Sequence, residues 1–99
     1  MKKEIHHYMI EVDSSDKKLV ESIREGLGKL GCIEKYSGDT GVYYAQFFTC
    51  RNTMVIIGFS EAYFIDIFSE KTDIEPYIKI LTDVFGKDKL IVHYVIRSI

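Results

Sequence analysis

The chain has 99 residues, of which 46% are hydrophobic, and this size predicts one domain, residues 1–99, built around a single core. Thirteen Lys and Arg side chains against fifteen Asp and Glu leave a formal charge of -2 without a cationic tract. The basic surface expected of a nucleic-acid-binding protein is therefore missing. No apolar run is long enough to span a bilayer, so we expect neither nucleic acid nor a membrane as a partner.

The N-terminal segment MKKEIHHYMIEV places basic residues before apolar ones, as a signal peptide does. Polar residues, among them Glu4, His6 and Glu11, interrupt the apolar run, so we expect a cytoplasmic protein. Cys32 and Cys50 are far apart and neither has a CxxC partner. The spacing predicts neither a disulfide framework nor a zinc site, and we expect reduced, mostly buried thiols.

The first third of the chain has the pattern of a strand followed by a helix. The segment from His6 to Val12 is rich in β-forming residues, and the cluster from Asp13 to Asp16 can cap a following helix. Gly31 can take the left-handed position that ends a helix. Between these points the apolar residues recur at three- and four-residue spacing: Leu19, Val20, Ile23, Leu27 and Leu30.

The middle of the chain has the pattern of an antiparallel meander, in which aromatic and β-branched segments alternate with short turns. The predicted strands run from Cys32 to Tyr36, Gly41 to Cys50, Met54 to Phe59 and Ala62 to Phe68, and the turns are Ser37-Gly38-Asp39, Arg51-Asn52 and Ser60-Glu61.

A second helix and a last strand complete the pattern. Thr72 and Glu75 have the spacing of a capping box, Pro76 falls in the first turn, and Gly86 ends the helix before a strand from Leu90 to Ile96. The order βαββββαβ predicts an α+β two-layer sandwich, with two helices on one face of a mainly antiparallel sheet. The other face carries several tyrosines, and we expect a homo-oligomer, a dimer or trimer, to cover it.

The segments TMVIIGF, SEAYFIDIF and TDIEPYIKILTDVF follow one another as strand, turn, strand, loop and helix. This sequence resembles the bacterial-type S-adenosylmethionine decarboxylases. In that family a Glu-Ser pair is cleaved and the serine becomes a pyruvoyl cofactor. The corresponding window, Thr49 to Met54, lacks the family's Glu-Ser-His phrase and the histidine that follows it. We therefore expect no pyruvoyl decarboxylation and no cofactor.

The resemblance nevertheless assigns roles to three residues. Glu61 lies in a turn similar to the family's Trp-Pro-Glu turn, which implies that it holds the ribose hydroxyls of a substrate. Glu70 stands where the family has a thiol proton donor, and His7 matches a histidine near the start of the first strand. The alternative for Glu61 is that it only solvates a hairpin turn.

A second resemblance concerns chemistry. Gly31-Cys32-Ile33-Glu34 and Asp39-Thr40-Gly41-Val42-Tyr43 are similar to phrases of the phage S-adenosylmethionine lyases, which are small oligomeric α/β proteins. Those enzymes let the carboxylate of the substrate displace 5′-methylthioadenosine, which leaves homoserine lactone. Neither metal nor cofactor is needed, because orienting the reacting groups can lower a barrier by on the order of 7 to 11 kcal/mol.

A sulfonium is a soft cation that favours aromatic faces and carboxylates. The predicted catalytic residues are Glu70 and Tyr43, and the predicted substrate-binding residues are His7, Glu34, Tyr36, Thr40 and Glu61. The alternative for the tyrosines is packing on the sheet with their hydroxyls at its rim. His6 and His7 point to opposite faces of a strand and His93 is distant in sequence, so no metal site is predicted.

The sequence thus favours a lyase that acts on S-adenosylmethionine as its small-molecule substrate, or on a nucleotide-conjugated derivative. Such a derivative could be an adenylated signal molecule of antiviral signalling, whose phosphate would meet Lys35 and Arg51. A non-catalytic S-adenosylmethionine-binding or regulatory decarboxylase-like module is the first alternative. A ligand-free oligomerisation domain is the second.

Overall fold

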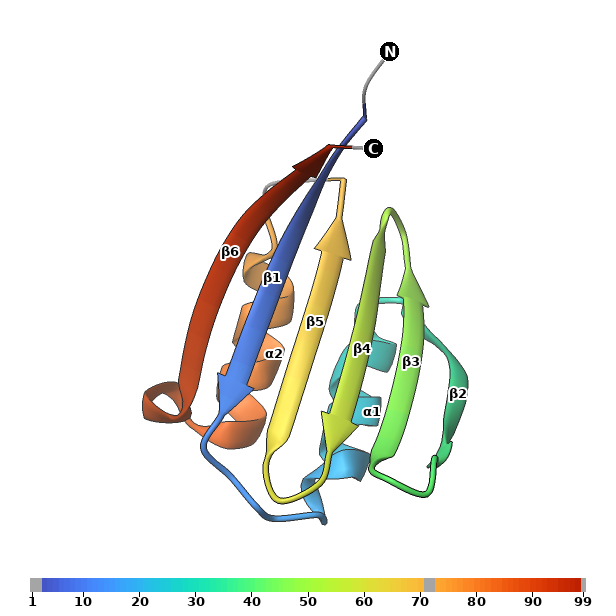
Figure 1. Ribbon diagram of the computed structural model, residues 1–99, viewed down its shortest axis with the longest axis vertical. Coiled ribbons are helices and arrows are strands. Elements are labelled where there is room, and N and C mark those ends of the chain that lie inside the picture. Colours follow the sequence, from blue (N-terminus) through green and yellow to red (C-terminus); the bar gives the residue numbers. More distant parts are fainter. Residues whose placement is uncertain (1–2, 71–72, 99) are drawn as a thin grey trace.

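The chain folds around one six-stranded antiparallel sheet, as the computed structural model in Figure 1 shows. The structure describes residues 3–70 and 73–98. The strand order across the sheet is β2-β3-β4-β5-β1-β6, so the first strand of the chain is inserted between two later ones. The strands are β1 (Glu4–Val12), β2 (Ile33–Asp39), β3 (Tyr44–Cys50), β4 (Thr53–Phe59), β5 (Tyr63–Ser69) and β6 (Leu90–Ser98).

Both helices cover the same face of the sheet (Figure 1). They are α1 (Leu19–Lys29) and α2 (Glu75–Phe85), and a short 3-10 helix, Lys87–Lys89, leads into β6. The order βαββββαβ and the two-layer α+β architecture confirm the sequence prediction, and all five strand pairings are antiparallel.

The core lies between the helices and the sheet, because alternate strand residues point to the helical face. The two helices approach each other closely above this layer: a Cβ added to Gly26 would lie 2.5 Å from Cγ2 of Ile80, so Ile80 would have to move. The core residues with 1% exposure or less are Ile10, Ile23, Leu27, Phe48, Val55, Ile57, Ile65, Ile67 and Leu81.

The hairpin between β2 and β3 differs from the prediction. The strand continues to Asp39, so the predicted turn Ser37-Gly38-Asp39 is extended backbone. A register shift between Glu34 and Tyr36 lets the strand continue and moves the turn to residues 40–43. There the N–H and the hydroxyl of Thr40 both donate to the carbonyl of Tyr43, at 2.9 Å each.

The helix ends agree only in part with the prediction. Helix α1 starts at Leu19 without a side-chain cap, because Asp16 Oδ1 accepts the N–H of Lys18 in the turn before it. Gly31 has a φ of 82° and the helix ends there as predicted. Pro76 lies in the first turn of α2, also as predicted. The predicted capping box includes Thr72, which is outside the described residues.

The two cysteines form a disulfide, Cys32–Cys50, with 4.2 Å between their Cα atoms. The expectation of reduced thiols was therefore wrong. Ile33 pairs with Thr49 at the end of the β2–β3 ladder, and the cysteines are the next residues on each strand. Antiparallel pairing thus places side by side two residues that are 18 apart in sequence.

Candidate functional site

The sheet face opposite the helices has no covering layer in the described chain (Figure 1). Met54 and Phe64 lie on this open face with 40% and 43% of their surface exposed. The ring of Phe64 lies over Gly58, where an added Cβ would approach the ring to 2.2 Å. A large exposed apolar face of this kind usually marks a surface that binds a ligand or another protein.

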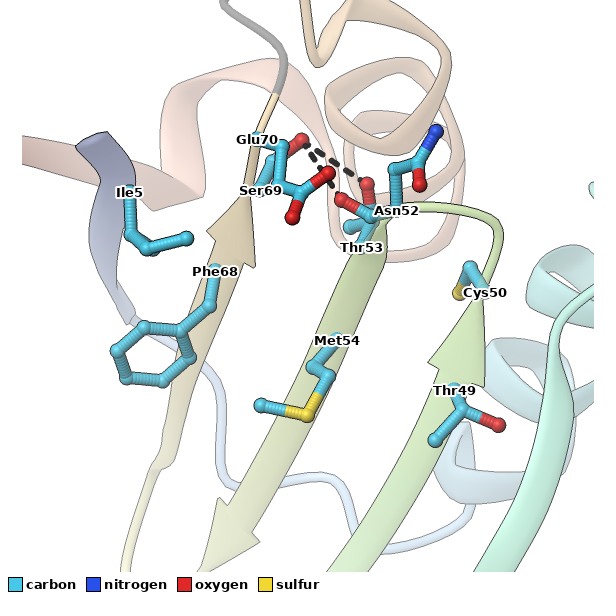
Figure 2. A pocket seen from close by; sticks show the side chains of 9 residues that line it. All are labelled: Ile5, Thr49, Cys50, Asn52, Thr53, Met54, Phe68, Ser69 and Glu70. Carbon is cyan, nitrogen blue, oxygen red and sulfur yellow. Dashed lines mark hydrogen bonds between the residues drawn. The ribbon is translucent and has the colours of Figure 1, made fainter. Parts of the chain in front are cut away.

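A cavity of about 430 Å³ lies where β4 begins and β5 ends (Figure 2). Its walls are mostly apolar, with side chains from four strands and from the turn between β3 and β4. Among the described lining residues Glu70 is the one ionisable side chain, since Cys50 is in a disulfide. The lining residues are Ile5, Thr49, Cys50, Asn52, Thr53, Met54, Phe68, Ser69 and Glu70.

Hydrogen bonds between β4 and β5 fix the polar end of this cavity (Figure 2). The hydroxyl oxygens of Thr53 and Ser69 are 3.0 Å apart, and both residues are buried. The Ser69 hydroxyl also donates to the carbonyl of Asn52, at 3.4 Å, and the N–H of Glu70 donates to the same carbonyl, at 3.1 Å. Buried hydrogen bonds of this kind hold the rim in one geometry.

Glu70 lies at the mouth of the cavity, with 39% of its side chain exposed, and forms an ion pair with Lys3. An exposed pair of this kind contributes little to stability, so it can exchange for another cation at low cost. The carboxylate is therefore the group in this cavity that can meet a positively charged ligand.

Three predicted site residues lie at the other end of the sheet. Glu61 is in the loop between β4 and β5, and Thr40 and Tyr43 are in the loop between β2 and β3, both at the end of the sheet opposite the β3–β4 turn (Figure 1). The seven residues of β5 separate these loops from Glu70 by roughly 20 Å, at about 3.3 Å per residue. Within one chain Glu70 and Tyr43 do not share a small ligand.

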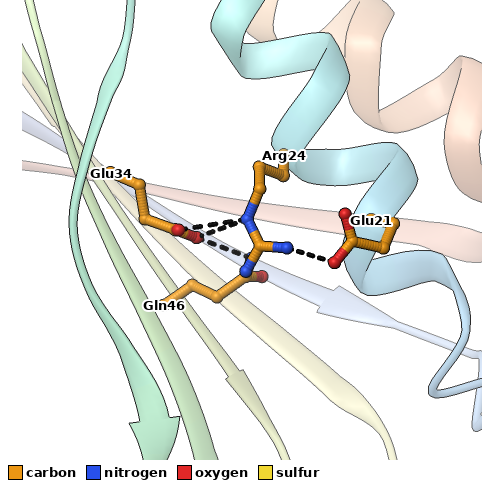
Figure 3. A network of polar contacts seen from close by, with 4 residues as sticks. All are labelled: Glu21, Arg24, Glu34 and Gln46. Atoms are coloured by element: carbon orange, nitrogen blue, oxygen red, sulfur yellow. Dashed lines mark hydrogen bonds and ion pairs between the residues drawn. The ribbon is translucent and has the colours of Figure 1, made fainter.

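Glu34 lies on the helical side of β2, where its carboxylate already has partners (Figure 3). Arg24 Nε donates to both carboxylate oxygens at 3.0 Å, and Gln46 Nε2 donates at 3.2 Å. Arg24 also forms an ion pair with Glu21, and the hydrogen bonds with Glu21 and Glu34 raise the pKa of its guanidinium. This network ties α1 to the sheet.

Tyr36 and Tyr43 are both exposed and far from the cavity. Tyr36 lies on edge strand β2, and its hydroxyl is close to Gly38. The ring of Tyr43 packs against Phe64, with 5.6 Å between the ring centroids. Tyr36 lies on β2, three residues before its end, whereas Tyr43 lies in the turn at residues 40–43, so the two do not flank one tight turn.

His7 is 6% exposed and lies on the open face beside the cavity. Its Nε2 is 2.8 Å from Asp66 Oδ1, and Arg97 Nε donates to its Nδ1 at 2.9 Å. Because Nδ1 accepts this bond, the proton of the neutral ring is on Nε2 and is donated to Asp66. The imidazole also stacks on Phe68 at 4.1 Å, and Phe68 lines the cavity.

The sequence analysis missed Asp66 and Arg97 as site residues. They come from β5 and β6, which both pair with β1 although they lie 59 and 90 residues from His7 in sequence. The alternation along each strand places them on the open face, but only the strand order brings the three together.

A comparison of the chain with known protein-family models found no match, and a search among curated proteins found no relative. The two resemblances drawn from the sequence therefore depend on residue patterns alone.

The remaining histidines do not join His7. His6 points to the helical face, where it hydrogen bonds to the hydroxyl of Tyr94, and His93 is 2.9 Å from Glu11 at the edge of the sheet. Within residues 3–70 and 73–98, no group of three His, Cys, Asp or Glu side chains could hold a metal ion. None of the helices in this part of the chain is long and apolar enough to cross a membrane.

Proposed function

We propose that the protein is a lyase that binds S-adenosylmethionine, or a nucleotide-conjugated derivative of it, in the cavity beside Glu70. The observation that supports this is the composition of the cavity. Apart from Ile5, its lining residues all fall within positions 49–54 and 68–70, the two windows that the decarboxylase resemblance associates with the reacting centre.

The size and lining of the cavity suit a sulfonium nucleoside. A volume of about 430 Å³ is within the range of small-molecule pockets. Met54 and Phe68 offer apolar surface for an adenine ring or a methylthio group, and Asn52 has an amide that can bind ribose hydroxyls. Glu70 supplies the negative charge that a sulfonium requires.

The proposed reaction is an intramolecular displacement. An oxygen of the substrate carboxylate attacks the γ-carbon of the methionine chain, which is bonded to sulfur. The bond between this carbon and sulfur breaks, and its electron pair stays on sulfur. The products are homoserine lactone and neutral 5′-methylthioadenosine, or its adenylated form. Because the positive charge disappears during the reaction, Glu70 stabilises the bound substrate more than the transition state. The rate gain must come from folding the methionine chain so that the carboxylate meets the carbon.

The test is incubation of the purified protein with S-adenosylmethionine, and separately with its adenylated derivative, followed by chromatography and mass spectrometry. We expect methylthioadenosine and homoserine lactone without added metal or cofactor. The Glu70→Gln variant should raise KM about 10-fold, since the attraction between two unit charges about 4 Å apart contributes on the order of 1–4 kcal/mol at a partly exposed site. The matched Glu61→Gln variant should keep the wild-type KM, because Glu61 lies at the opposite end of β5.

A non-catalytic binding module is the second candidate. It is favoured by Glu70, the single ionisable side chain among the described lining residues, because its charge stabilises the bound substrate more than the transition state. Saturable binding of S-adenosylmethionine with no product after prolonged incubation at stoichiometric protein would select this candidate. Absence of both binding and turnover would rule out both functions.

A cytoplasmic location is part of this proposal, because S-adenosylmethionine is made and used inside cells. The Cys32–Cys50 disulfide is the observation against it, since disulfides are rare in reducing compartments. Rapid alkylation of thiols in intact cells distinguishes the two cases. Two alkylated cysteines indicate a reducing compartment, and none indicates an oxidising one.

A further inference from the structure

Arg97 is held in place by a chain of side chains on the open face of the sheet. Asp66 accepts from His7 Nε2, and His7 Nδ1 accepts from Arg97 Nε. The imidazole cannot turn away, because it is buried and stacks on Phe68. An arginine whose Nε is fixed in this way has little freedom to rotate its guanidinium group.

The outer edge of this guanidinium is available to a ligand. Its Nε is used by His7, and in the described parts of the chain no carboxylate forms an ion pair with Arg97. The two terminal nitrogens form the end-on fork that binds a carboxylate or phosphate through two parallel hydrogen bonds. Arg97 is exposed, so an oxyanion can reach it from solvent.

Arg97 lies next to residues that line the cavity. Ile5, which lines the cavity, is the cross-strand partner of Arg97 in the pairing of β1 with β6. Phe68, another lining residue, stacks on the imidazole that holds Arg97. Glu70 and Arg97 therefore offer opposite charges from β5 and β6, on either side of β1. This arrangement matches a ligand that carries a cation and an oxyanion a few bonds apart.

We propose that Arg97, positioned by His7 and Asp66, is an oxyanion receptor that holds the carboxylate or a phosphate group of the ligand bound in the Glu70 cavity. This inference rests on the proposed function. Arg97 is the ligand-contacting residue, whereas His7 and Asp66 are positioning residues. In the displacement reaction an anchored carboxylate is kept close to the carbon that it attacks, which is the positioning that the reaction needs.

The test measures affinities by titration calorimetry with four ligands: S-adenosylmethionine, its decarboxylated form, its adenylated form and methylthioadenosine. If the receptor holds the carboxylate, the wild-type protein binds S-adenosylmethionine ~10–100-fold tighter than the decarboxylated form, as expected for a charge-assisted pair. If it holds a phosphate, the adenylated form has that advantage over S-adenosylmethionine.

Four variants test whether Arg97 causes the tighter binding of the ligand that carries the oxyanion. Arg97→Gln should remove it, and Arg97→Lys should keep only part, because a lysine has no fork. His7→Phe keeps a ring on Phe68 but removes the Nδ1 acceptor, so it should also reduce the preference. Lys87→Gln is the matched control for loss of a distant positive charge, because Lys87 lies in the 3-10 helix before β6, at the other end of that strand from Arg97, and it should retain the preference. The affinity for methylthioadenosine, which has neither anionic group, should be the same in all four variants.

The outcomes separate this inference from the proposed function. If S-adenosylmethionine binds but its preference survives in Arg97→Gln, or falls equally in Lys87→Gln, the receptor is wrong while the cavity assignment stands. If none of the four ligands binds the wild-type protein, the proposed function is wrong and the receptor falls with it.

Discussion

At the scale of single residues, the polar contacts on the helical side of β2 distinguish a carboxylate that stabilises the fold from one that is proposed to bind a ligand. Gln46 is 0% exposed, and the carboxylate of Glu34 is the partner of its amide nitrogen. The amide oxygen of Gln46 has no partner in the described part of the chain. A buried amide that loses its remaining hydrogen bond costs more than the bond itself contributed. Glu34 therefore contributes to stability through the groups that it satisfies.

Replacing Glu34 by alanine should lower the free energy of unfolding by about 1–3 kcal/mol, because Gln46 would be left buried without a partner for its nitrogen. Urea denaturation monitored by circular dichroism measures this change. Glu21→Ala is a matched control, since Glu21 contacts the same Arg24 from a side chain that is 75% exposed, and it should cost under ~1 kcal/mol. Equal losses in the two variants would contradict this assignment.

Only those parts of the candidate site that come from residues close together in the sequence could be predicted from it. Glu70 was predicted from the sequence, and the window Thr49 to Met54 was matched to the family's processing site; Glu70 and every residue of that window except Arg51 line one cavity, and their roles stay predictions. Asp66 and Arg97 were not predicted, because their contact with His7 depends on β1 entering the sheet between β5 and β6. Alternation along a strand gives the face of a residue but not its neighbours on other strands.

At the scale of elements, two links outside the strand pairings support the fold. The hydroxyl of Tyr63, at the start of β5, donates to the carbonyl of Asp16 at 2.8 Å, and so ties the segment before α1 to the sheet. The disulfide Cys32–Cys50 closes the hairpin of β2 and β3 at its open end. The first link joins the helical layer to the sheet, and the second joins two neighbouring strands of the sheet.

The buried hydroxyl of Tyr63 makes the free energy of unfolding depend on pH in the alkaline range. Burial, with a smaller effect of nearby Asp16, raises the pKa of Tyr63 from 10.0 to about 12. The unfolded chain therefore loses this proton before the folded one does, and the stabilisation present below pH 10 is lost as the pH rises toward 12. Relative to a Tyr63→Phe variant, the wild-type free energy of unfolding should fall by on the order of 2 kcal/mol over this range. Denaturation at a series of pH values measures it, and parallel curves for the two proteins would contradict the prediction.

The second link predicts sensitivity to reductant. A crosslink between residues 18 apart stabilises a fold by about 3 kcal/mol, mainly by restricting the unfolded chain. Reduction should lower the melting temperature by several degrees, as should the double variant Cys32→Ser with Cys50→Ser. The double variant is the control, because reductant should have no further effect on it. Two titratable thiols in the native, untreated protein would contradict the disulfide.

Element types were more predictable than element ends. Periodicity in α1 and α2 and alternation in the strands gave the order of all eight main elements. The end of β2 was misplaced because Ser37, Gly38 and Asp39 have turn propensity, which pairing with β3 overrides. The disulfide was missed for a related reason, since its formation depends on the register of the same pair of strands.

At the scale of the whole molecule, the sheet ends in a strand that nothing in the described chain covers. Edge strand β6 spans nine residues, and Ile91, Val92, Tyr94, Val95 and Ile96 are each between 39% and 58% exposed. Apolar side chains are therefore exposed on both faces of an edge whose backbone can still pair. Long apolar edges are usually shortened, charged or paired, and β6 carries only Arg97 as a permanent charge.

The expected partner of β6 is β6 of a second copy, because the strand is complementary to itself. In an antiparallel pair centred on Tyr94, Val92 faces Ile96 of the other copy, and Arg97 faces Ile91, so no like charges meet. Two-fold symmetry then joins two six-stranded sheets into one. This predicted dimer pairs two sheet edges, and unlike the oligomer expected from the sequence it does not cover the open face.

Charge placed at this contact tests the pairing. Ile96→Lys should shift the protein toward the monomer, since each lysine would face an apolar valine, and adding Val92→Glu should restore the dimer by placing a glutamate opposite each lysine. Sedimentation velocity over a range of concentrations measures both changes. Val42→Lys is the matched control, because Val42 is 83% exposed in the loop between β2 and β3, and it should leave the association unchanged. A wild-type protein that stays monomeric at every concentration, or a double variant as monomeric as Ile96→Lys, would exclude this interface, because restoration by opposite charges requires that residues 92 and 96 face each other across the two-fold axis.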